Sequence, residues 1–150
     1  MADLALKRKP NGCYDLDFDA ETNDLNVSDS LANSIVLSLG TYARERNLPV
    51  NKANLKPSRG FWADSLSVGE LGGRLYEAFP GELTQESADK VKVLALEALA
   101  WLKDDGVAKS IECQANIDGK NLVLILEIAK PDGGRESFEF ELNWEATNGI

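Results

Sequence analysis

The sequence predicts an α+β domain in which about three helices pack on a small antiparallel sheet with a C-terminal three-stranded meander. Apolar residues recur every three to four positions in the middle of the chain, and they alternate with polar residues near its end. Helices followed by hairpin-linked strands are typical of this class. The chain has 150 residues and shows no repeat, low-complexity tract or interdomain linker, so we expect residues 1–150 to form a single domain.

The N-terminal stretch is predicted to form strands and turns. Residues 10–12, Pro-Asn-Gly, are a turn signal, and residues 14–19 alternate Tyr, Leu and Phe with three Asp residues. These residues superficially resemble a calcium-binding loop. Such a loop needs glycine at its sixth position and glutamate at its twelfth, where this chain has Ala20 and Asn26. A half-buried strand with one acidic face is therefore the preferred interpretation.

Three helices are predicted from the spacing of apolar residues. The first follows N-cap candidates at residues 28–30 and carries an apolar stripe over residues 31–42. A short helix is expected over residues 68–79, although three glycines weaken it. The longest is expected over residues 84–105, with Thr84 as its N-cap and Gly106 as its C-terminal glycine.

The C-terminal part of the chain predicts the meander. Residues 111–115 alternate apolar and polar side chains, and residues 122–129 form a nearly continuous apolar run. Asp-Gly at 118–119 and Pro-Asp-Gly-Gly at 131–134 mark the two turns. Residues 135–144 alternate again, so the last strand is expected at an edge of the sheet with an acidic outer face.

The charge and hydropathy of the chain argue against several kinds of partner. The formal net charge is −9 and the isoelectric point is near 4.5, which disfavours nucleic acid and anionic lipid. No apolar run approaches the roughly 20 residues that cross a bilayer. The basic cluster at residues 7–9 follows a very short apolar stretch, the reverse of a secretory signal. We therefore expect no membrane association, and folding in the compartment of synthesis.

The residue types needed for common catalytic chemistries are missing. The chain has no histidine, and Cys13 and Cys113 do not form a Cys-x-x-Cys pair. No serine lies in a Gly-x-Ser-x-Gly motif. With 25 acidic residues, pairs of carboxylates arise by chance, so they carry little weight as glycosidase signals. We therefore expect no catalytic, cofactor-binding or metal-binding residues and no small-molecule substrate.

Two surfaces are predicted to contact protein partners. The segment 44–59 carries five positive residues against one negative, and Trp62 follows it closely. Core packing of Trp62 and a protected, partner-free edge at residues 135–144 are the alternatives. The candidate contact residues are Arg44, Arg46, Arg59, Trp62, Arg135, Glu139 and Glu141.

The order of four short motifs indicates a family. They are Asp-Ser-Leu-Ala-Asn-Ser-Ile-Val-Leu-Ser-Leu at 29–39, Arg-Gly-Phe-Trp-Ala-Asp at 59–64, Leu-Gly-Gly-Arg-Leu-Tyr at 71–76 and Glu-Ala-Leu-Ala-Trp-Leu-Lys-Asp-Asp-Gly-Val at 97–107. In this order and spacing the chain resembles the Mu-like phage tail baseplate wedge proteins, which are related to the tail lysozyme-like wedge family of contractile tails. The resemblance spans nearly the whole chain.

The resemblance implies a non-enzymatic virion structural protein, synthesised and assembled in the bacterial host cytoplasm and located in the tail baseplate. Its implied partners are other baseplate wedge and hub proteins and the tail sheath, which it helps to seat. The wider family carries Glu-Pro-Arg near the end of its long helix, where this chain has Lys103-Asp104-Asp105. A peptidoglycan-degrading, tail lysozyme-like enzyme and a generic soluble adaptor domain are the alternatives.

Overall fold

The structure is a computed structural model that describes residues 3–10, 13–28, 31–43, 61, 66 and 71–147. The chain divides into two compact units, Met1–Leu37 and Ser38–Ile150. Within the described ranges, no helix is long and apolar enough to cross a membrane.

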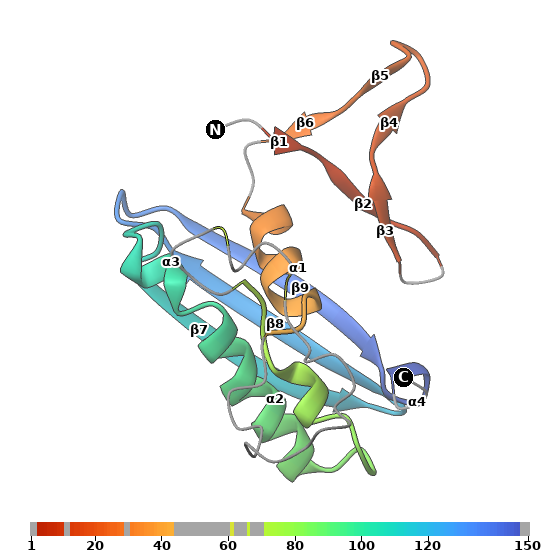
Figure 1. The fold of residues 1–150 in the computed structure, drawn as a ribbon, viewed down its shortest axis with the longest axis vertical. Coiled ribbons are helices and arrows are strands. Elements are labelled where there is room, and N and C mark those ends of the chain that lie inside the picture. The colour runs from red at the N-terminus through yellow and green to blue at the C-terminus, as the bar shows by residue number, and fades with distance from the viewer. Residues whose placement is uncertain are drawn as a thin grey trace. The chain divides into compact units, whose positions relative to one another are not determined.

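The unit Met1–Leu37 contains three two-stranded antiparallel ribbons that point in three directions (Figure 1). The pairs are β1 (Asp3–Leu4) with β6 (Val27–Ser28), β2 (Leu6–Arg8) with β3 (Tyr14–Leu16), and β4 (Phe18–Asp19) with β5 (Asp24–Leu25). The strand expected over residues 14–19 is therefore interrupted at Asp17, and its two halves belong to different ribbons.

Three linking residues join the ribbons, namely Ala5, Asp17 and Asn26. The Ala5 amide donates to the Asn26 carbonyl at 2.8 Å, the Asn26 amide to the Asp17 carbonyl at 2.9 Å, and the Asp17 amide to the Ala5 carbonyl at 2.8 Å. The Asn26 side-chain amide also donates to the Asp17 carboxylate at 2.9 Å. The ribbons thus meet at a junction closed by a ring of three main-chain hydrogen bonds.

Helix α1 (Ala32–Gly40) follows the ribbons, where the first helix was expected. Within Met1–Leu37, the Asn33 side chain donates a hydrogen bond to the Leu4 carbonyl. This bond ties the start of α1 to ribbon β1–β6.

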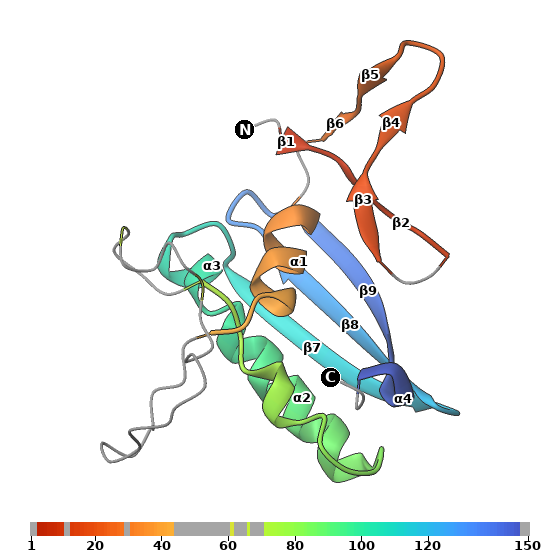
Figure 2. The same ribbon diagram turned by 45° about the vertical axis from the view of Figure 1, so that its right-hand side comes forward.

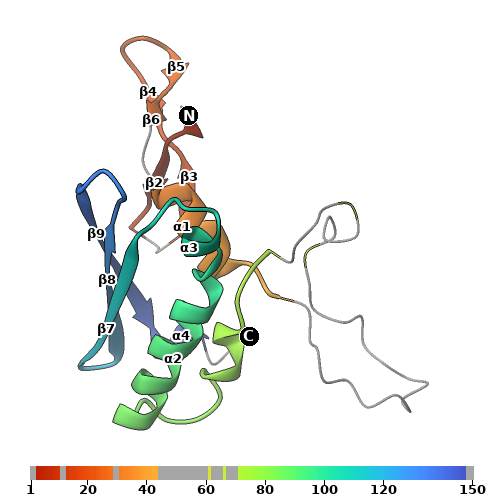
Figure 3. The ribbon, with the colours of Figure 1, turned by 90° about the vertical axis from the view of Figure 1, so that its left-hand side faces the viewer.

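The unit Ser38–Ile150 holds the C-terminal sheet and the long helix. Its elements are the 3₁₀ turn η2 (Leu75–Glu77), α2 (Gln85–Ala98), α3 (Trp101–Asp104), β7 (Ser110–Asp118), β8 (Asn121–Ala129), β9 (Arg135–Asn143) and α4 (Trp144–Thr147). The strands form an antiparallel sheet in the order β7-β8-β9, and α2 lies along one of its faces (Figure 3).

The core of this unit lies between α2 and the sheet. Buried side chains come from α2 and the residues after it (Val91, Leu94, Ala95, Leu99 and Leu102) and from β8 (Leu122, Leu124, Leu126 and Ile128). Full burial of each such side chain contributes about 1.5–3 kcal/mol. Strand β8 supplies most of the sheet side of the core because it is central and hydrogen-bonded on both edges.

Helix α2 begins as expected but ends earlier. Thr84 is the N-cap: its hydroxyl accepts from the Ser87 amide at 3.2 Å, and its own amide donates to the Ser87 hydroxyl at 2.8 Å. After Ala98 the main-chain hydrogen bonds change from the i→i−4 to the i→i−3 type. The Ala100 amide, for example, donates to the Glu97 carbonyl at 3.2 Å. The single helix expected over residues 84–105 is therefore α2 followed by the one-turn helix α3.

The predicted fold class is wrong in its arrangement. The helices longer than one turn in the described chain are α1 and α2, and the strands divide into four separate sheets rather than one. Of the prediction, the C-terminal meander is present. The N-terminal strands do not join it because they pair among themselves around the three linking residues.

The helix expected over residues 68–79 is also wrong in the described part, where only the turn η2 is helical. Its glycines serve a close main-chain approach instead. The Gly73 amide donates to the Thr41 carbonyl at 2.9 Å, and the Ala43 amide donates to the Gly73 carbonyl at 3.0 Å. Gly72 has φ +109°, and a Cβ there would lie 2.4 Å from the Thr41 oxygen. A helix would break this pairing.

Candidate functional site

The predicted contact residues fall into two groups. Arg44, Arg46, Arg59 and Trp62 lie outside the described residues. Arg135, Glu139 and Glu141 are exposed on β9 and alternate with the more buried Phe138, Phe140 and Leu142. The structure thus places these three on the sheet face opposite α2.

We call this the outer face of the sheet. It is made of the residues that alternate with the buried ones on each strand: Glu112, Gln114 and Asn116 on β7, Val123, Ile125 and Glu127 on β8, and Arg135, Glu139 and Glu141 on β9. Val123 and Ile125 are half-buried at its centre, and the surrounding side chains are polar and exposed. The outer face is therefore a short apolar strip with a mainly acidic border.

Two carboxylates of the outer face form a like-charged pair across neighbouring strands. Glu112 and Glu127 are directly opposite each other on β7 and β8. Like charges in such cross-strand positions are destabilising by about 0.2–1 kcal/mol. Beside the apolar strip, Glu141 accepts a hydrogen bond from the Asn121 side-chain amide at 2.5 Å.

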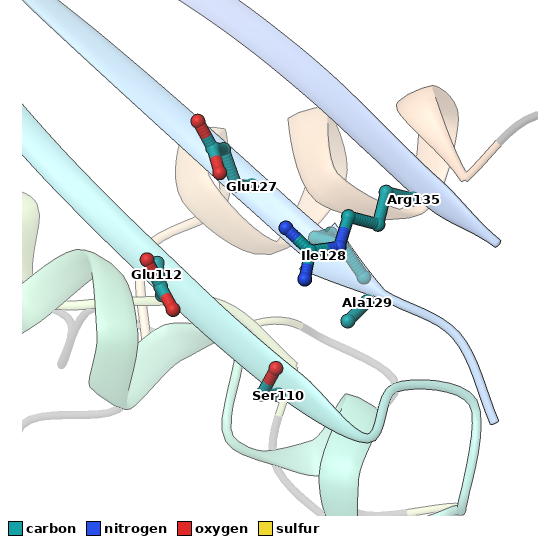
Figure 4. A pocket seen from close by; sticks show the side chains of 6 residues that line it. All are labelled: Ser110, Glu112, Glu127, Ile128, Ala129 and Arg135. Atoms are coloured by element: carbon teal, nitrogen blue, oxygen red, sulfur yellow. The ribbon is translucent and has the colours of Figure 1, made fainter. Parts of the chain in front are cut away.

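A shallow depression lies at one end of the outer face (Figure 4). It is lined by Ser110, Glu112, Glu127, Ile128, Ala129 and Arg135. Figure 4 shows the Glu112 and Glu127 carboxylates on neighbouring strands and Arg135 extending from β9 over the same end. The depression has no deep apolar chamber of the kind that small-molecule ligands fill.

Strand β9 is an edge of the sheet and is held firmly at both ends. At one end Lys130 forms an ion pair with Glu136, which raises the pKa of the lysine. At the other end the Trp144 indole donates a hydrogen bond to the Gly81 carbonyl at 2.9 Å. Its ring packs edge-on against the Phe79 ring, with the ring centroids 5.5 Å apart. Both ends of β9 are thus next to residues that contact neighbouring segments.

Three observations on the described residues concern catalysis. No group of three or more His, Cys, Asp or Glu residues among them is arranged to hold a metal ion. Burial raises the pKa of the Cys113 thiol to about 11, so it is not a ready nucleophile. Hydrogen bonds lower the pKa of Asp15 (first from Lys9) and of Asp19 (first from the Glu21 amide), the opposite of what a general acid needs.

Comparisons with known proteins give the family. A family model described as Phage protein GP46 matches residues 31–135. The chain is 37% identical over 147 residues to the Mu-like prophage FluMu protein gp46 of Haemophilus influenzae, covering 96% of this chain and 98% of that protein. It is 30% identical over 151 residues to Baseplate protein gp46 of Escherichia phage Mu, covering 100% of both.

The chain belongs to the phage protein GP46 family. This confirms the resemblance to Mu-like baseplate proteins that the four motifs indicated. The match to the GP46 family model begins at Leu31, after the three ribbons, and ends at Arg135, the first residue of β9. The two relatives align over nearly all of the chain, so their alignments extend over the ribbons as well.

Part of this surface in the GP46-family chain was predicted from the sequence and part was not. The alternation of the last strand predicted Arg135, Glu139 and Glu141. Glu112, Glu127, Val123 and Ile125 were not predicted to lie on the same face. The signal was present, because the turn at residues 118–119 sets the register that pairs β7 with β8.

In contrast to the exposed carboxylates of the outer face, Arg74 forms an ion pair inside the unit Ser38–Ile150. Its guanidinium donates to both carboxylate oxygens of Glu97, at 2.7 and 2.8 Å, and lies 3.7 Å from Glu77. The Glu97 hydrogen bond raises the pKa of Arg74. Arg74 is therefore paired within its own unit.

Proposed function

We propose that this chain is a structural subunit of the baseplate of a Mu-like contractile tail. One observation carries the proposal: the phage Mu relative that aligns with the whole chain is named as a baseplate protein. The arrangement of the outer face is compatible with assembly, because an exposed, mainly acidic surface favours specific docking to a basic partner. On this proposal the chain acts in the virion tail after synthesis in the host cytoplasm.

The more specific role that we propose is that of a non-enzymatic wedge protein. It would join other wedge proteins and the hub, and help seat the tail sheath. Two features of the chain support contacts with several neighbours: an acidic sheet face and a basic segment at residues 44–59. Surfaces of opposite sign on one subunit specify register and partner more than they add affinity.

The contact residues that we propose follow from this division. Glu139 and Glu141 on β9 would meet basic groups of one neighbour, and Arg135 would meet a carboxylate at the end of the same strand. As the last strand in the order β7-β8-β9, β9 would also pair with an extended segment of a partner. Arg44, Arg46, Arg59 and Trp62 would form the second contact.

Capture of purified, co-encoded tail proteins by the immobilised chain tests the role. The wild type should retain at least one wedge, hub or sheath protein. Glu139→Lys with Glu141→Lys should abolish capture of one neighbour, and Arg44, Arg46 and Arg59 changed to Glu should abolish capture of another. Glu82→Lys with Glu86→Lys is the matched control, because it makes the same charge change at exposed residues around the start of α2.

The outcomes separate the parts of the proposal. Capture lost in the outer-face variant but kept in the control supports the β9 contact. Capture unaffected by either contact variant keeps the assembly role and rejects both surfaces. No capture of any tail protein by the wild type rejects the assembly role.

The non-enzymatic part has its own test. Purified chain incubated with peptidoglycan should release no soluble fragments above a buffer blank. Release that a single acidic substitution abolishes would show a hydrolase and overturn this part.

A further inference from the structure

The outer face of the sheet has one apolar row, and this row lies on the central strand. Val123 and Ile125 of β8 are half-buried there. The residues paired with them on the two edge strands are all polar and exposed, namely Gln114 and Asn116 on β7 and Glu139 and Glu141 on β9. The apolar part of the outer face is therefore one strand wide and has polar residues on both sides.

The charged residues around the apolar row are left unpaired. Four of them are exposed and form no ion pair or side-chain hydrogen bond with another residue that the structure describes: Glu112, Glu127, Arg135 and Glu139. Charged side chains elsewhere in the unit do pair, as Lys120 does with Glu145 at 2.7 Å. Because three of the four are carboxylates, the outer face has a net negative charge that its own residues do not neutralise.

The dimensions of the outer face fit a single helix. Each strand has nine residues, which at about 3.4 Å per residue gives a length of about 30 Å. Three strands about 4.8 Å apart give a width of about 14 Å. A helix with its side chains is roughly 10–12 Å across, so it fits when it runs along the strands. Figure 2 shows α2 running along the strands in this way on the opposite face.

The narrow apolar row distinguishes between possible occupants of the outer face. A second sheet packs through apolar side chains from several neighbouring strands, whereas among the described strands β8 alone offers them on this face. An amphipathic helix instead carries one apolar stripe with polar residues on both flanks. Laid along β8, its stripe would cover Val123 and Ile125, and its flanks would lie over β7 and β9. The carboxylates on this face require Lys or Arg in those flanks.

We propose that the outer face binds a basic amphipathic helix of another tail protein, laid along β8. This inference rests on the proposed assembly role, which supplies the class of protein that carries the helix. On one flank, Lys or Arg residues of the helix pair with Glu139 and Glu141. Near one end they pair with Glu112 and Glu127, whose carboxylates lie on neighbouring strands (Figure 4). An acidic residue of the helix faces Arg135 at the same end.

Threonine substitutions in the apolar row test the central contact. Val123→Thr with Ile125→Thr keeps two β-branched side chains, which suit a strand, but makes the row polar. This variant should bind one of the purified, co-encoded tail proteins about tenfold more weakly than the wild type does, because the apolar contact is lost. Val93→Thr is the matched control, since Val93 is 63% exposed on α2, and it should bind like the wild type. Circular dichroism should match the wild type in both variants.

Lysine substitutions on the two sides of the row test whether one partner spans it. Glu112→Lys with Glu127→Lys, and separately Glu139→Lys with Glu141→Lys, should weaken capture of the same tail protein. Raising the salt concentration should weaken its capture by the wild type as well, because the exposed charges are screened. The control with two lysine substitutions around the start of α2 should bind like the wild type. A partner that pairs with the edge of β9 alone would respond to the second variant and not to the first.

Photo-cross-linking measures the shape of the occupant. A photoreactive amino acid is placed at Ser110 in one variant and at Asn116 in another, both of which are exposed on the outer face of β7. These positions are about 20 Å apart along the strand. The two residues captured in the partner should be about 13 positions apart in its sequence if the partner is helical. They would be about six positions apart if the partner were extended.

Three results would overturn the proposal while the assembly role stands. One is full capture of every tail protein by the threonine variant. Another is a pair of captured residues about six positions apart, which would show an extended occupant. The third is capture without a cross-link from either position, which would place the contact on another surface. Failure of the wild type to capture any tail protein would instead reject the assembly role, and this inference with it.

Discussion

The sheet of Ser38–Ile150 and the ribbons of Met1–Leu37 are both antiparallel, yet they treat their apolar residues in opposite ways. Strand β8 buries Leu122, Leu124, Leu126 and Ile128 under α2. The ribbons leave Leu4, Leu16, Phe18 and Val27 exposed. Main-chain hydrogen bonds pair the strands in both regions. Hydrogen bonding thus specifies the path of the chain in each, but only the first region has the buried area that makes a fold stable alone.

The largest expected difference comes from truncating one leucine in each region. Leu124→Ala should lower the free energy of unfolding by about 2–5 kcal/mol because it leaves a cavity in the core. Leu16→Ala should change it by no more than about 0.5 kcal/mol in the monomeric chain, because the side chain is already exposed. Urea unfolding followed by tryptophan fluorescence measures both. Equal losses of unfolding free energy in the two variants would show that Leu16 is as important to the folded core as Leu124, which would contradict the difference between the two regions.

Glycine-to-alanine substitutions at two positions test how closely the main chain is packed in a part of the unit Ser38–Ile150 outside the sheet. Gly72 and Gly81 both have φ +109°, but a Cβ would meet the Thr41 main chain only at Gly72. Gly72→Ala should therefore cost about 1–3 kcal/mol more than Gly81→Ala. The difference between their thermal midpoints measures the steric part, since the strain from φ is common to both. Equal thermal midpoints would mean that the main chain of residues 41–43 moves at little cost to make room for the added Cβ.

Ion pairs should also differ between the two regions, by a smaller amount. A double-mutant cycle on Arg74 and Glu97 should give a coupling of about 0.5–1 kcal/mol, because one guanidinium nitrogen, Nη2, donates to both carboxylate oxygens and the arginine side chain is partly shielded. The same cycle on Lys9 and Asp15 should give less, because both side chains are more than half exposed. A larger coupling in the ribbon pair would contradict this order.

The two thiols give the smallest expected effect on stability near neutral pH and a clear contrast in reactivity. Cys13 is exposed and should react with Ellman's reagent in the native state, whereas buried Cys113 should react only on unfolding. The folded pKa of Cys113 is raised from 9.0 to about 11, so its unfolded form releases a proton first. Stability should therefore fall as pH rises from about 9 to 11, and this fall should be weaker in Cys113→Ala. An identical pH dependence in both proteins would contradict the burial of the thiol.

Local signals in the sequence were enough to place several elements. Thr84 caps α2, Gly106 takes φ +72° after α3, and Gly119 and Gly133 take positive φ in the two turns of the meander. In each case the controlling contacts lie within a few residues. The same holds for Glu139 and Glu141, whose common face follows from strand alternation alone.

Other features depend on contacts between distant residues, and the sequence patterns did not reveal them. Residues 14–19 alternate like one strand, but hydrogen bonds from Ala5 and Asn26 divide them at Asp17. Residues 71–79 have helical spacing, yet Gly73 pairs with Thr41 and Ala43 instead. Propensity is a weak prior where such pairing is available.

By itself the sequence determined the meander with its turns, the start of α2, the acidic last strand and the family, because these rest on period, caps and motif order. The tertiary structure decided that α2 ends at Ala98, that the glycines at 72 and 73 admit a close main-chain approach, and that residues 14–19 are divided between two ribbons. The physical reason is the range of the interactions. Local ones are encoded in adjacent residues, whereas the register between distant segments is chosen only when the chain closes on itself.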